Sequence, residues 1–192
     1  KKQKFEDIHA KFPDLLSKLC SELNVKKLVH ISALGINETV SSQYMLSKLN
    51  GEKNIINNFN RSVILRPSVI FGPEDKFFNQ FASLAEFFPA LPLIGGGLTY
   101  FQPIYVGDVA KSIMTVLEKE EISKSIYELG GPQTFTFKEL MKILLKEINK
   151  KRFLVPVPFL FAKFQATILQ LLPKPLLTTD QVEMLKYDNI VT

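Results

Sequence analysis

Stretches with helix-like spacing of apolar residues alternate with short strand-like apolar runs along this chain, and no other feature constrains its fold as strongly. Apolar spacing with a proline in the first turn predicts an amphipathic helix at 13–24, and a short buried-type strand follows at 28–32. The same alternation predicts helices at 41–59, 77–88, from 108 on and at 136–148, with strands at 63–66, 100–106 and 126–129. It is typical of βα units around a parallel sheet, so we expect an α/β fold.

Local signals mark where several of these elements begin and end. Serines at 41–42 are expected to cap the second helix, and Asp108 a later one. Thr136 with Glu139 has the spacing of a capping box. The three glycines at 95–97 precede a strand-like segment, which predicts a hairpin turn.

The tail of the chain has a different composition from the rest. Apolar residues dominate 153–177, and a helix predicted at 159–172 is too short to cross a bilayer, which needs about 20 residues. Its wide apolar surface predicts either packing on its own domain or docking to a membrane or a larger assembly. We therefore expect a main domain at 1–150, with interspersed substrate-region segments at about 73–105, and an apolar helical docking region at 151–192.

Charge and composition exclude several classes of function. The formal charge is +5, but most of the basic residues are lysines scattered among acidic ones, so we expect no nucleic-acid partner. Cys20 is the one cysteine, which excludes an internal disulfide, and its place among leucines predicts a buried thiol. Two histidines and one cysteine supply no ligand set for zinc, so no metal site is expected.

Tyr44 and Lys48 are the residues that could carry chemistry. Residues four apart on a helix share a face, so a phenol and an ammonium can point into one pocket. A nearby cation lowers a phenol pKa that starts at about 10, so that Tyr44 can act as acid or base toward an alcohol or carbonyl. Ser32, at the predicted carboxyl end of a strand, could bind the same substrate oxygen. Taken alone, the pair fits an exposed helix face equally well.

Four motifs in order resemble the short-chain dehydrogenase/reductase superfamily in its extended and atypical branches. Lys27-Leu-Val-His-Ile-Ser32 resembles the strand that ends in the active-site serine, and Tyr44-Met-Leu-Ser-Lys48 resembles the catalytic helix. Residues 65–73 resemble the strand and loop along the nicotinamide, and 103–110 resemble a later signature. The resemblance implies a partial Rossmann-like parallel sheet with a smaller α-rich carboxyl-terminal region, catalytic roles for Ser32, Tyr44 and Lys48, and cofactor contacts from Tyr44, Lys48, Pro67, Ser68, Val69 and Ile70.

Further segments resemble the nucleotide-binding alpha-subcomplex subunit 9 family of respiratory complex I and its bacterial relatives. They are Phe-Glu-Asp-Ile-His at 5–9, residues 71–82, and the tail from 153 to 184. The resemblance implies complex I subunits as partners and a membrane periphery reached through 153–177. It favours NADP(H) over NAD(H). It also implies a place beside the inner membrane, on the cytoplasmic face in a bacterium or the matrix face in a mitochondrion.

The family's glycine-rich phosphate-binding turn belongs at its first strand, yet no glycine precedes Gly35. We expect a fragment without that half, which binds nicotinamide nucleotides weakly, is not catalytic by itself and has an open sheet edge at 28–32. The first hypothesis is an NAD(P)H-binding accessory subunit or assembly partner of complex I. The second is an active reductase, epimerase or dehydratase in which Tyr44 is the general acid/base, Lys48 lowers its pKa and Ser32 orients the carbonyl.

Overall fold

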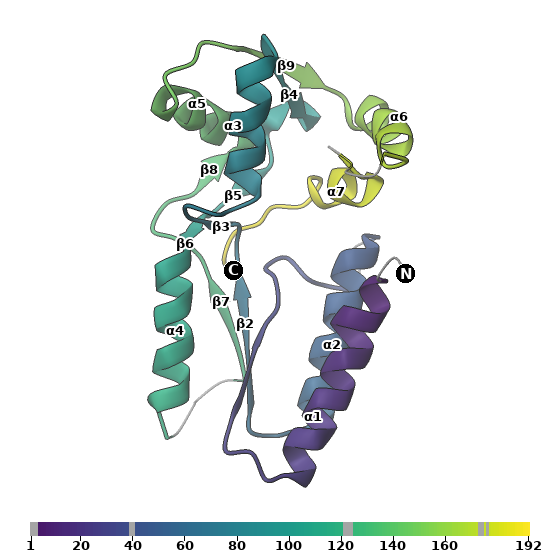
Figure 1. The fold of residues 1–192 in the computed structure, drawn as a ribbon, viewed down its shortest axis with the longest axis vertical. Coiled ribbons are helices and arrows are strands. Elements are labelled where there is room, and N and C mark those ends of the chain that lie inside the picture. Colours follow the sequence, from purple (N-terminus) through teal and green to yellow (C-terminus); the bar gives the residue numbers. More distant parts are fainter. Residues whose placement is uncertain (1–3, 39–40, 121–124, 173–174, 176) are drawn as a thin grey trace. The chain divides into compact units, whose positions relative to one another are not determined.

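Figure 1 shows the chain as a computed structural model that describes residues 4–38, 41–120, 125–172, 175 and 177–192. The chain divides into two compact units. The first comprises Lys1–Ser68, Val106–Leu129 and Val191–Thr192, and the second comprises Val69–Tyr105 and Gly130–Ile190.

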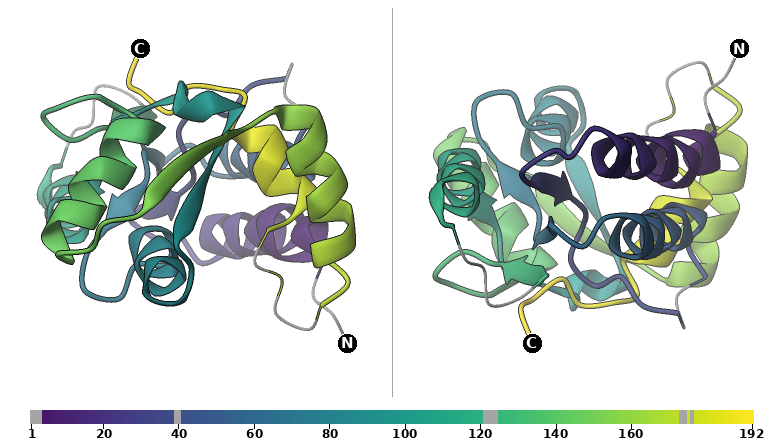
Figure 2. Two further views of the ribbon diagram at one scale, coloured as in Figure 1. Left: turned by 90° about the horizontal axis from the view of Figure 1, so that it is seen from above. Right: turned by 90° about the horizontal axis from the view of Figure 1, so that it is seen from below.

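The first unit has three layers (Figure 1; Figure 2). Its parallel sheet has the order β1 (Leu28–Ile31), β2 (Ser62–Pro67), β7 (Ile126–Leu129). Helices α1 (Phe12–Glu22) and α2 (Gln43–Asn58) cover one face, and α4 (Val106–Glu118) lies on the other. The central strand β2 is almost entirely buried, as its unbroken apolar run predicts for a strand covered on both faces. The expected α/β fold with a parallel sheet is confirmed.

Helices α1 and α2 lie side by side and approach closely at Gly51. A β-carbon there would lie 1.9 Å from the carbonyl oxygen of His9, so glycine is needed for this contact. His9 belongs to a π-helical turn, η1 (Asp7–Lys11), that leads directly into α1. The packing of the two helices therefore places the η1 backbone directly on α2.

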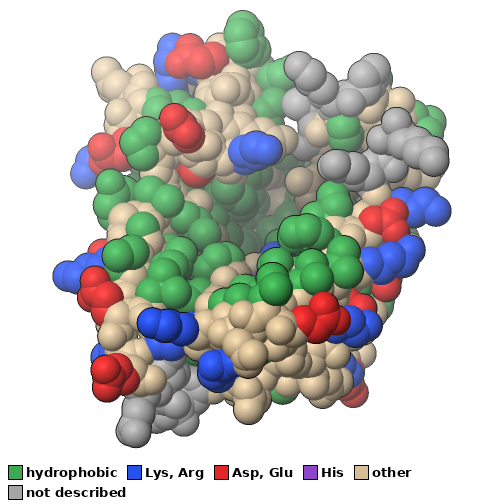
Figure 3. All heavy atoms as spheres, turned by 60° about the horizontal axis from the view of Figure 1, so that its bottom comes forward, with side chains coloured by type: hydrophobic (Ala, Val, Ile, Leu, Met, Phe, Trp, Pro, Cys, Tyr) green, Lys and Arg blue, Asp and Glu red, His purple; other side chains and the backbone are tan. Residues whose placement is uncertain are grey.

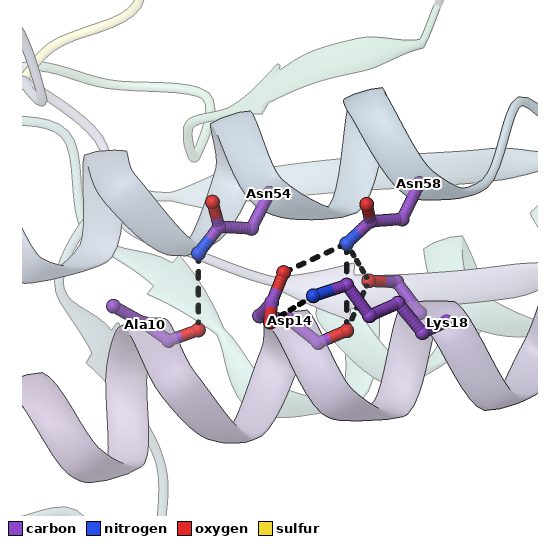
Figure 4. A network of polar contacts seen from close by, with 6 residues as sticks. Ala10, Asp14, Lys18, Asn54 and Asn58 are labelled. Carbon is purple, nitrogen blue, oxygen red and sulfur yellow. Dashed lines mark hydrogen bonds and ion pairs between the residues drawn. The ribbon is translucent and has the colours of Figure 1, made fainter.

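Polar side chains continue this contact along the helices (Figure 4). Asn54 Nδ2 donates to the carbonyl oxygen of Ala10 at 3.3 Å, and Asn58 Nδ2 donates to Asp14 Oδ1 at 2.9 Å. Lys18 pairs with Oδ2 of the same aspartate at 2.7 Å. Because the contacts advance along both helices in the same order, α1 and α2 are parallel, as two helices leading into adjacent parallel strands must be.

The second unit is built around a parallel strand pair and a phenylalanine-rich core. Strand β4 (Ala90–Ile94) pairs with β9 (Phe153–Val157), and helices α3 (Phe77–Phe87) and α5 (Phe137–Glu147) contribute to the main apolar cluster. Ring centroids within this core lie 5.3 to 6.2 Å apart among Phe77, Phe81, Phe101 and Phe137. Such offset and edge-on ring contacts add to the stabilisation that burial provides.

The glycines at 95–97 do not form a hairpin turn, so that prediction is wrong. They form a 3-10 turn, η2, with positive φ angles of 62°, 72° and 71°. The strands on either side belong to different pairs, because β4 pairs with β9 whereas β5 (Tyr100–Phe101) pairs antiparallel with β8 (Phe135–Thr136). The extended segment predicted at 100–106 is likewise divided between β5 and β6 (Ile104–Tyr105), which pairs with β3 (Ile70–Phe71).

Helix ends agree with the capping predictions in two places and differ in one. The Ser42 side chain caps α2, and Thr136 with Glu139 forms the capping box of α5. Helix α4 begins at Val106, so Asp108 lies inside its first turn and not at its cap. Its carboxylate still interacts favourably with the positive end of the helix dipole.

The apolar tail contains helix α6 (Phe159–Leu169), shorter than the predicted 159–172, and α7 (Thr179–Met184). Within α6 the small residues Ala162 and Ala166 are buried. Most of the larger apolar side chains on and directly after α6 are exposed: Leu160, Phe161, Phe164, Ile168, Leu171 and Leu172. Across the described parts of the chain, every helix is too short or too polar to cross a membrane.

The pairing of β4 with β9 also decides how the chain is grouped. Residues 73–105, expected as interspersed segments, fall in the second unit. A division was expected at residue 150. The residues before and after it, 130–190, all fall in the second unit, where β9 pairs with β4.

Replacing Gly51 with alanine is expected to destabilise the chain by about 1–3 kcal/mol, because the new β-carbon would overlap the His9 carbonyl oxygen. Helix propensity alone acts in the opposite direction, by about 1 kcal/mol. Urea unfolding measures the change. Asn50→Ala, at the neighbouring exposed position, is the control, with an expected change under about 0.5 kcal/mol. A Gly51→Ala chain as stable as wild type would contradict the close contact.

Candidate functional site

Lys48 reaches the carboxyl end of β1, where Ser32 follows the strand. The Lys48 ammonium, on α2, donates to the carbonyl oxygen of Ile31 at 2.9 Å. Ser32 follows directly, and its backbone N–H donates to the carbonyl oxygen of Leu65 in β2 at 2.8 Å. Burial lowers the pKa of Lys48, and Glu52 partly opposes this shift. A half-buried cation is thus held at the end of the strands, where open parallel sheets bind ligands.

Tyr44 lies one helical turn before Lys48 and is half-buried. Its ring meets the rings of Phe5 and His9 edge-on, with centroid distances of 5.8 Å and 5.2 Å. Phe5 in turn stacks on His9 at 5.5 Å. The segment around η1 therefore supplies one wall beside the phenol.

Ser32 has a buried hydroxyl that makes no hydrogen bond within the described residues. The residue is 4% exposed, and a buried polar atom without a partner is rare enough to require an explanation. Nε2 of His30 is likewise buried and unbonded among the described residues. Burial, followed by the charge of Lys48, lowers the pKa of His30 to about 4. Two unsatisfied polar atoms therefore lie on either side of Ile31 in the sequence.

Glu52, one turn after Lys48 on α2, forms an ion pair with Arg66 on β2. Arg66 Nε and Nη2 donate to the two carboxylate oxygens of Glu52 at 3.0 Å and 2.5 Å. The side chains are 2% and 17% exposed for Glu52 and Arg66, and the carboxylate raises the pKa of the guanidinium. The bidentate pair joins α2 to β2.

The predicted nicotinamide contacts fall in two places. Pro67 and Ser68 end one segment of the first unit, whereas Val69 and Ile70 begin the second unit. The Pro67 carbonyl accepts a backbone N–H from the loop after Ser32 at 2.9 Å, and Ser68 is buried. Pro67 and Ser68 thus share a unit with Ser32 and the α2 residues, whereas Ile70 begins β3 and Val69 directly precedes it.

A cavity of about 400 Å³ lies on the α4 side of the sheet. Leu65, Tyr127 and Leu129 line it together with α4 residues that include Lys111 and Ser112, and none of the predicted site residues lines it.

Figure 3 shows that apolar side chains gather on the face it draws, with charged side chains around them. Among the described residues, no three His, Cys, Asp or Glu side chains group as metal ligands.

Four polar residues around Lys48 were not predicted as site residues: His9, His30, Glu52 and Arg66. One available signal was the spacing of Tyr44, Lys48 and Glu52, which puts all three on one face of α2. The contacts of His9 and Arg66 join segments distant in sequence, so local spacing could not have found them.

Solved structures share this architecture. A dTDP-glucose 4,6-dehydratase from Bacillus anthracis in complex with NAD aligns with a TM-score of 0.67 at 21% identity, over 80% of this chain and 56% of that one. A dTDP-4-dehydrorhamnose reductase from Clostridium acetobutylicum aligns with a TM-score of 0.67 at 13% identity, over 95% and 71%. The chain therefore has the Rossmann-like α/β fold that these structures share.

The sequence relatives are more specific. The chain is 32% identical to NADH dehydrogenase [ubiquinone] 1 alpha subcomplex subunit 9 of Arabidopsis thaliana, over 98% of this chain and 50% of that protein. The Mus musculus subunit is 30% identical over 97% and 50%, and the 40 kDa subunit of Neurospora crassa is 26% identical over 97% and 49%. The chain is a homologue of complex I alpha subcomplex subunit 9, as its motifs predicted. It spans about half the length of these curated relatives. No family model matches the chain.

Glu52→Gln is expected to destabilise the first unit by about 3 kcal/mol, because it leaves the Arg66 guanidinium without its charged partner. Urea unfolding measures the change. The control is Glu38→Gln, which removes an exposed ion pair with Lys53 and should cost under about 0.5 kcal/mol. If both substitutions lower the free energy of unfolding equally, burial of the Glu52–Arg66 pair adds nothing to stability.

His30 is expected to make folding sensitive to mild acid. Its folded pKa of about 4 lies below the ordinary value of 6.5, so the unfolded chain binds more protons between these values and stability falls as pH drops through that window. Lys48 and His9 favour neutral His30, and Glu52 opposes them. Between pH 7 and pH 5, wild type should lose about 2 kcal/mol more stability than His30→Leu. Parallel losses in urea unfolding would refute this role of His30.

Proposed function

We propose that this chain is part of an accessory subunit of respiratory complex I that binds a nicotinamide nucleotide. The observation that carries the proposal is similarity over 97–98% of the chain to proteins named as complex I subunits. Because the chain spans about half their length, the role belongs to the whole subunit, to which this chain contributes Ser32, Tyr44 and Lys48.

Residues at the end of β1 fit such a nucleotide. The buried hydroxyl of Ser32 lacks a partner among the described residues, so a ligand oxygen can satisfy it. An ammonium has three N–H donors, and Lys48 uses one on Ile31, which leaves donors for ribose hydroxyls. Pro67 ends the neighbouring strand β2 and Ser68 follows it, and both would contact the nicotinamide end. When bound, the nucleotide would supply a transferable hydride. The family resemblance favours NADP(H) over NAD(H).

The exposed apolar surface of α6 supports a docking role for the tail. Leu160, Phe161 and Phe164 are 84%, 55% and 64% exposed, which is typical of a surface that a partner covers. We propose that 153–177 contacts complex I subunits at the membrane periphery. The subunit would then lie beside the inner membrane, on the cytoplasmic face in a bacterium or the matrix face in a mitochondrion.

An active reductase, epimerase or dehydratase is the second candidate. The place of Tyr44 one helical turn before Lys48, which reaches the carbonyl oxygen of Ile31 directly before Ser32, favours it, because an accessory role alone does not require a phenol on that face of α2. In this function Tyr44 exchanges its phenolic proton with a substrate oxygen, Lys48 favours the phenolate and Ser32 orients the carbonyl.

Native purification with an antibody against this chain, from mild-detergent extracts of its own membranes, separates the two candidates. We expect complex I subunits and NADPH to co-purify, both identified by mass spectrometry. Recovery as a free soluble oligomer, with turnover lost in Tyr44→Phe but retained in the exposed-tyrosine control Tyr105→Phe, would select the enzyme. Protein free of both nucleotide and complex I subunits would contradict the proposal.

A further inference from the structure

We propose that His9 is a further ligand-binding residue of the Tyr44–Lys48 site, where its Nε2 accepts a hydrogen bond from a ribose hydroxyl of the bound nucleotide. This rests on the proposed function, because it requires a nicotinamide nucleotide at that site. The proposal assigns a chemical role to the turn η1, which lies far from α2 in sequence but against it in the fold.

The backbone and two rings hold His9 in one orientation. Its carbonyl oxygen lies against Gly51, so the η1 backbone can come no nearer to α2. Phe5 stacks on one face of the imidazole with an interplanar angle of 14°, and Tyr44 meets it at 90°. π-helical turns within helices occur frequently at functional sites, and η1 is one.

The hydrogen bonds around Ser47 determine which ring nitrogen of His9 carries the proton. Ser47 Oγ donates its one proton to the carbonyl oxygen of Tyr44 at 2.7 Å. It lies 3.1 Å from His9 Nδ1 and must therefore accept there, so Nδ1 is protonated. In a neutral ring Nε2 is then the acceptor, and it makes no hydrogen bond within the described residues.

The electrostatic environment keeps this ring neutral. Burial lowers the pKa of His9, and the charge of Lys48 lowers it further. The site thus combines a cationic donor at Lys48 with a neutral acceptor at His9. A vicinal diol suits this pair, because one hydroxyl can accept from the ammonium while its neighbour donates to the imidazole. Ribose carries such a diol.

The test is a titration of residues 1–192 with NADPH at millimolar concentration, followed by 15N NMR of the histidine rings. The chain has two histidines, and His30→Leu assigns their signals. We expect His9 to show a protonated Nδ1 and a bare Nε2, and the Nε2 signal to shift as NADPH binds.

Two variants separate ligand binding from packing. In His9→Asn the amide takes the place of Nδ1, which keeps a donor for Ser47 but removes the Nε2 acceptor. In His9→Gln the amide reaches the Nε2 position, which keeps an acceptor but loses the donor. Both variants lose the ring contacts with Phe5 and Tyr44, so we expect similar changes in thermal unfolding. We expect His9→Asn to weaken NADPH binding by roughly tenfold, and His9→Gln to bind more tightly than His9→Asn.

The outcomes distinguish this inference from the function on which it rests. If NADPH shifts the NMR signals of Tyr44 and Lys48 but not that of His9 Nε2, His9 is not a ligand-binding residue and the nucleotide site stands. The same holds if His9→Asn binds NADPH as tightly as wild type. If Nε2 carries the proton, it cannot accept a hydrogen bond, which overturns the role of His9 but leaves the nucleotide site standing. If neither Tyr44 nor Lys48 responds, the nucleotide site fails and the role of His9 fails with it.

Discussion

The buried ion pair between Glu52 and Arg66 is the interaction on which the rest of the first unit depends. The Glu52 side chain is 2% exposed, and a carboxylate at that depth is tolerated because the guanidinium binds both of its oxygens. The pair fixes the rotation of α2 against β2. Lys48, one turn earlier on the same face, then reaches the Ile31 carbonyl at the carboxyl end of β1, and Tyr44 lies one turn before it. The position of Tyr44 follows from these two contacts.

A second constraint, the contact at Gly51, brings a third segment to the same place. Without a side chain at Gly51, η1 packs directly on α2 and His9 reaches both Ser47 and the ring of Tyr44. The site is therefore assembled from η1, the end of β1 and α2. Its polar groups are incompletely satisfied at Ser32 within the described residues, which suits a place that holds a ligand.

Much of the fold could be predicted because it depends on local chemistry. The Ser42 cap and the apolar spacing located α2, and the capping box located α5. The glycines at 95–97 misled the prediction because turn residues report local conformation and say nothing about pairing. Strand β4 finds its partner in β9, far along the chain, so the hairpin that local signals indicated does not form. Val106 likewise starts α4 before the residue whose side chain suggested a cap.

By itself, the sequence determined the α/β class, the kinship with complex I alpha subcomplex subunit 9, and the Tyr44–Lys48 pair, since periodicity, ordered motifs and four-residue spacing are all local properties. Only the tertiary structure decided that Glu52 pairs with Arg66, that His9 joins the pair, and that Val69 and Ile70 belong to a different unit from Pro67 and Ser68. These contacts join residues distant in sequence, and they form because buried charges need partners and because glycine permits two helices to touch.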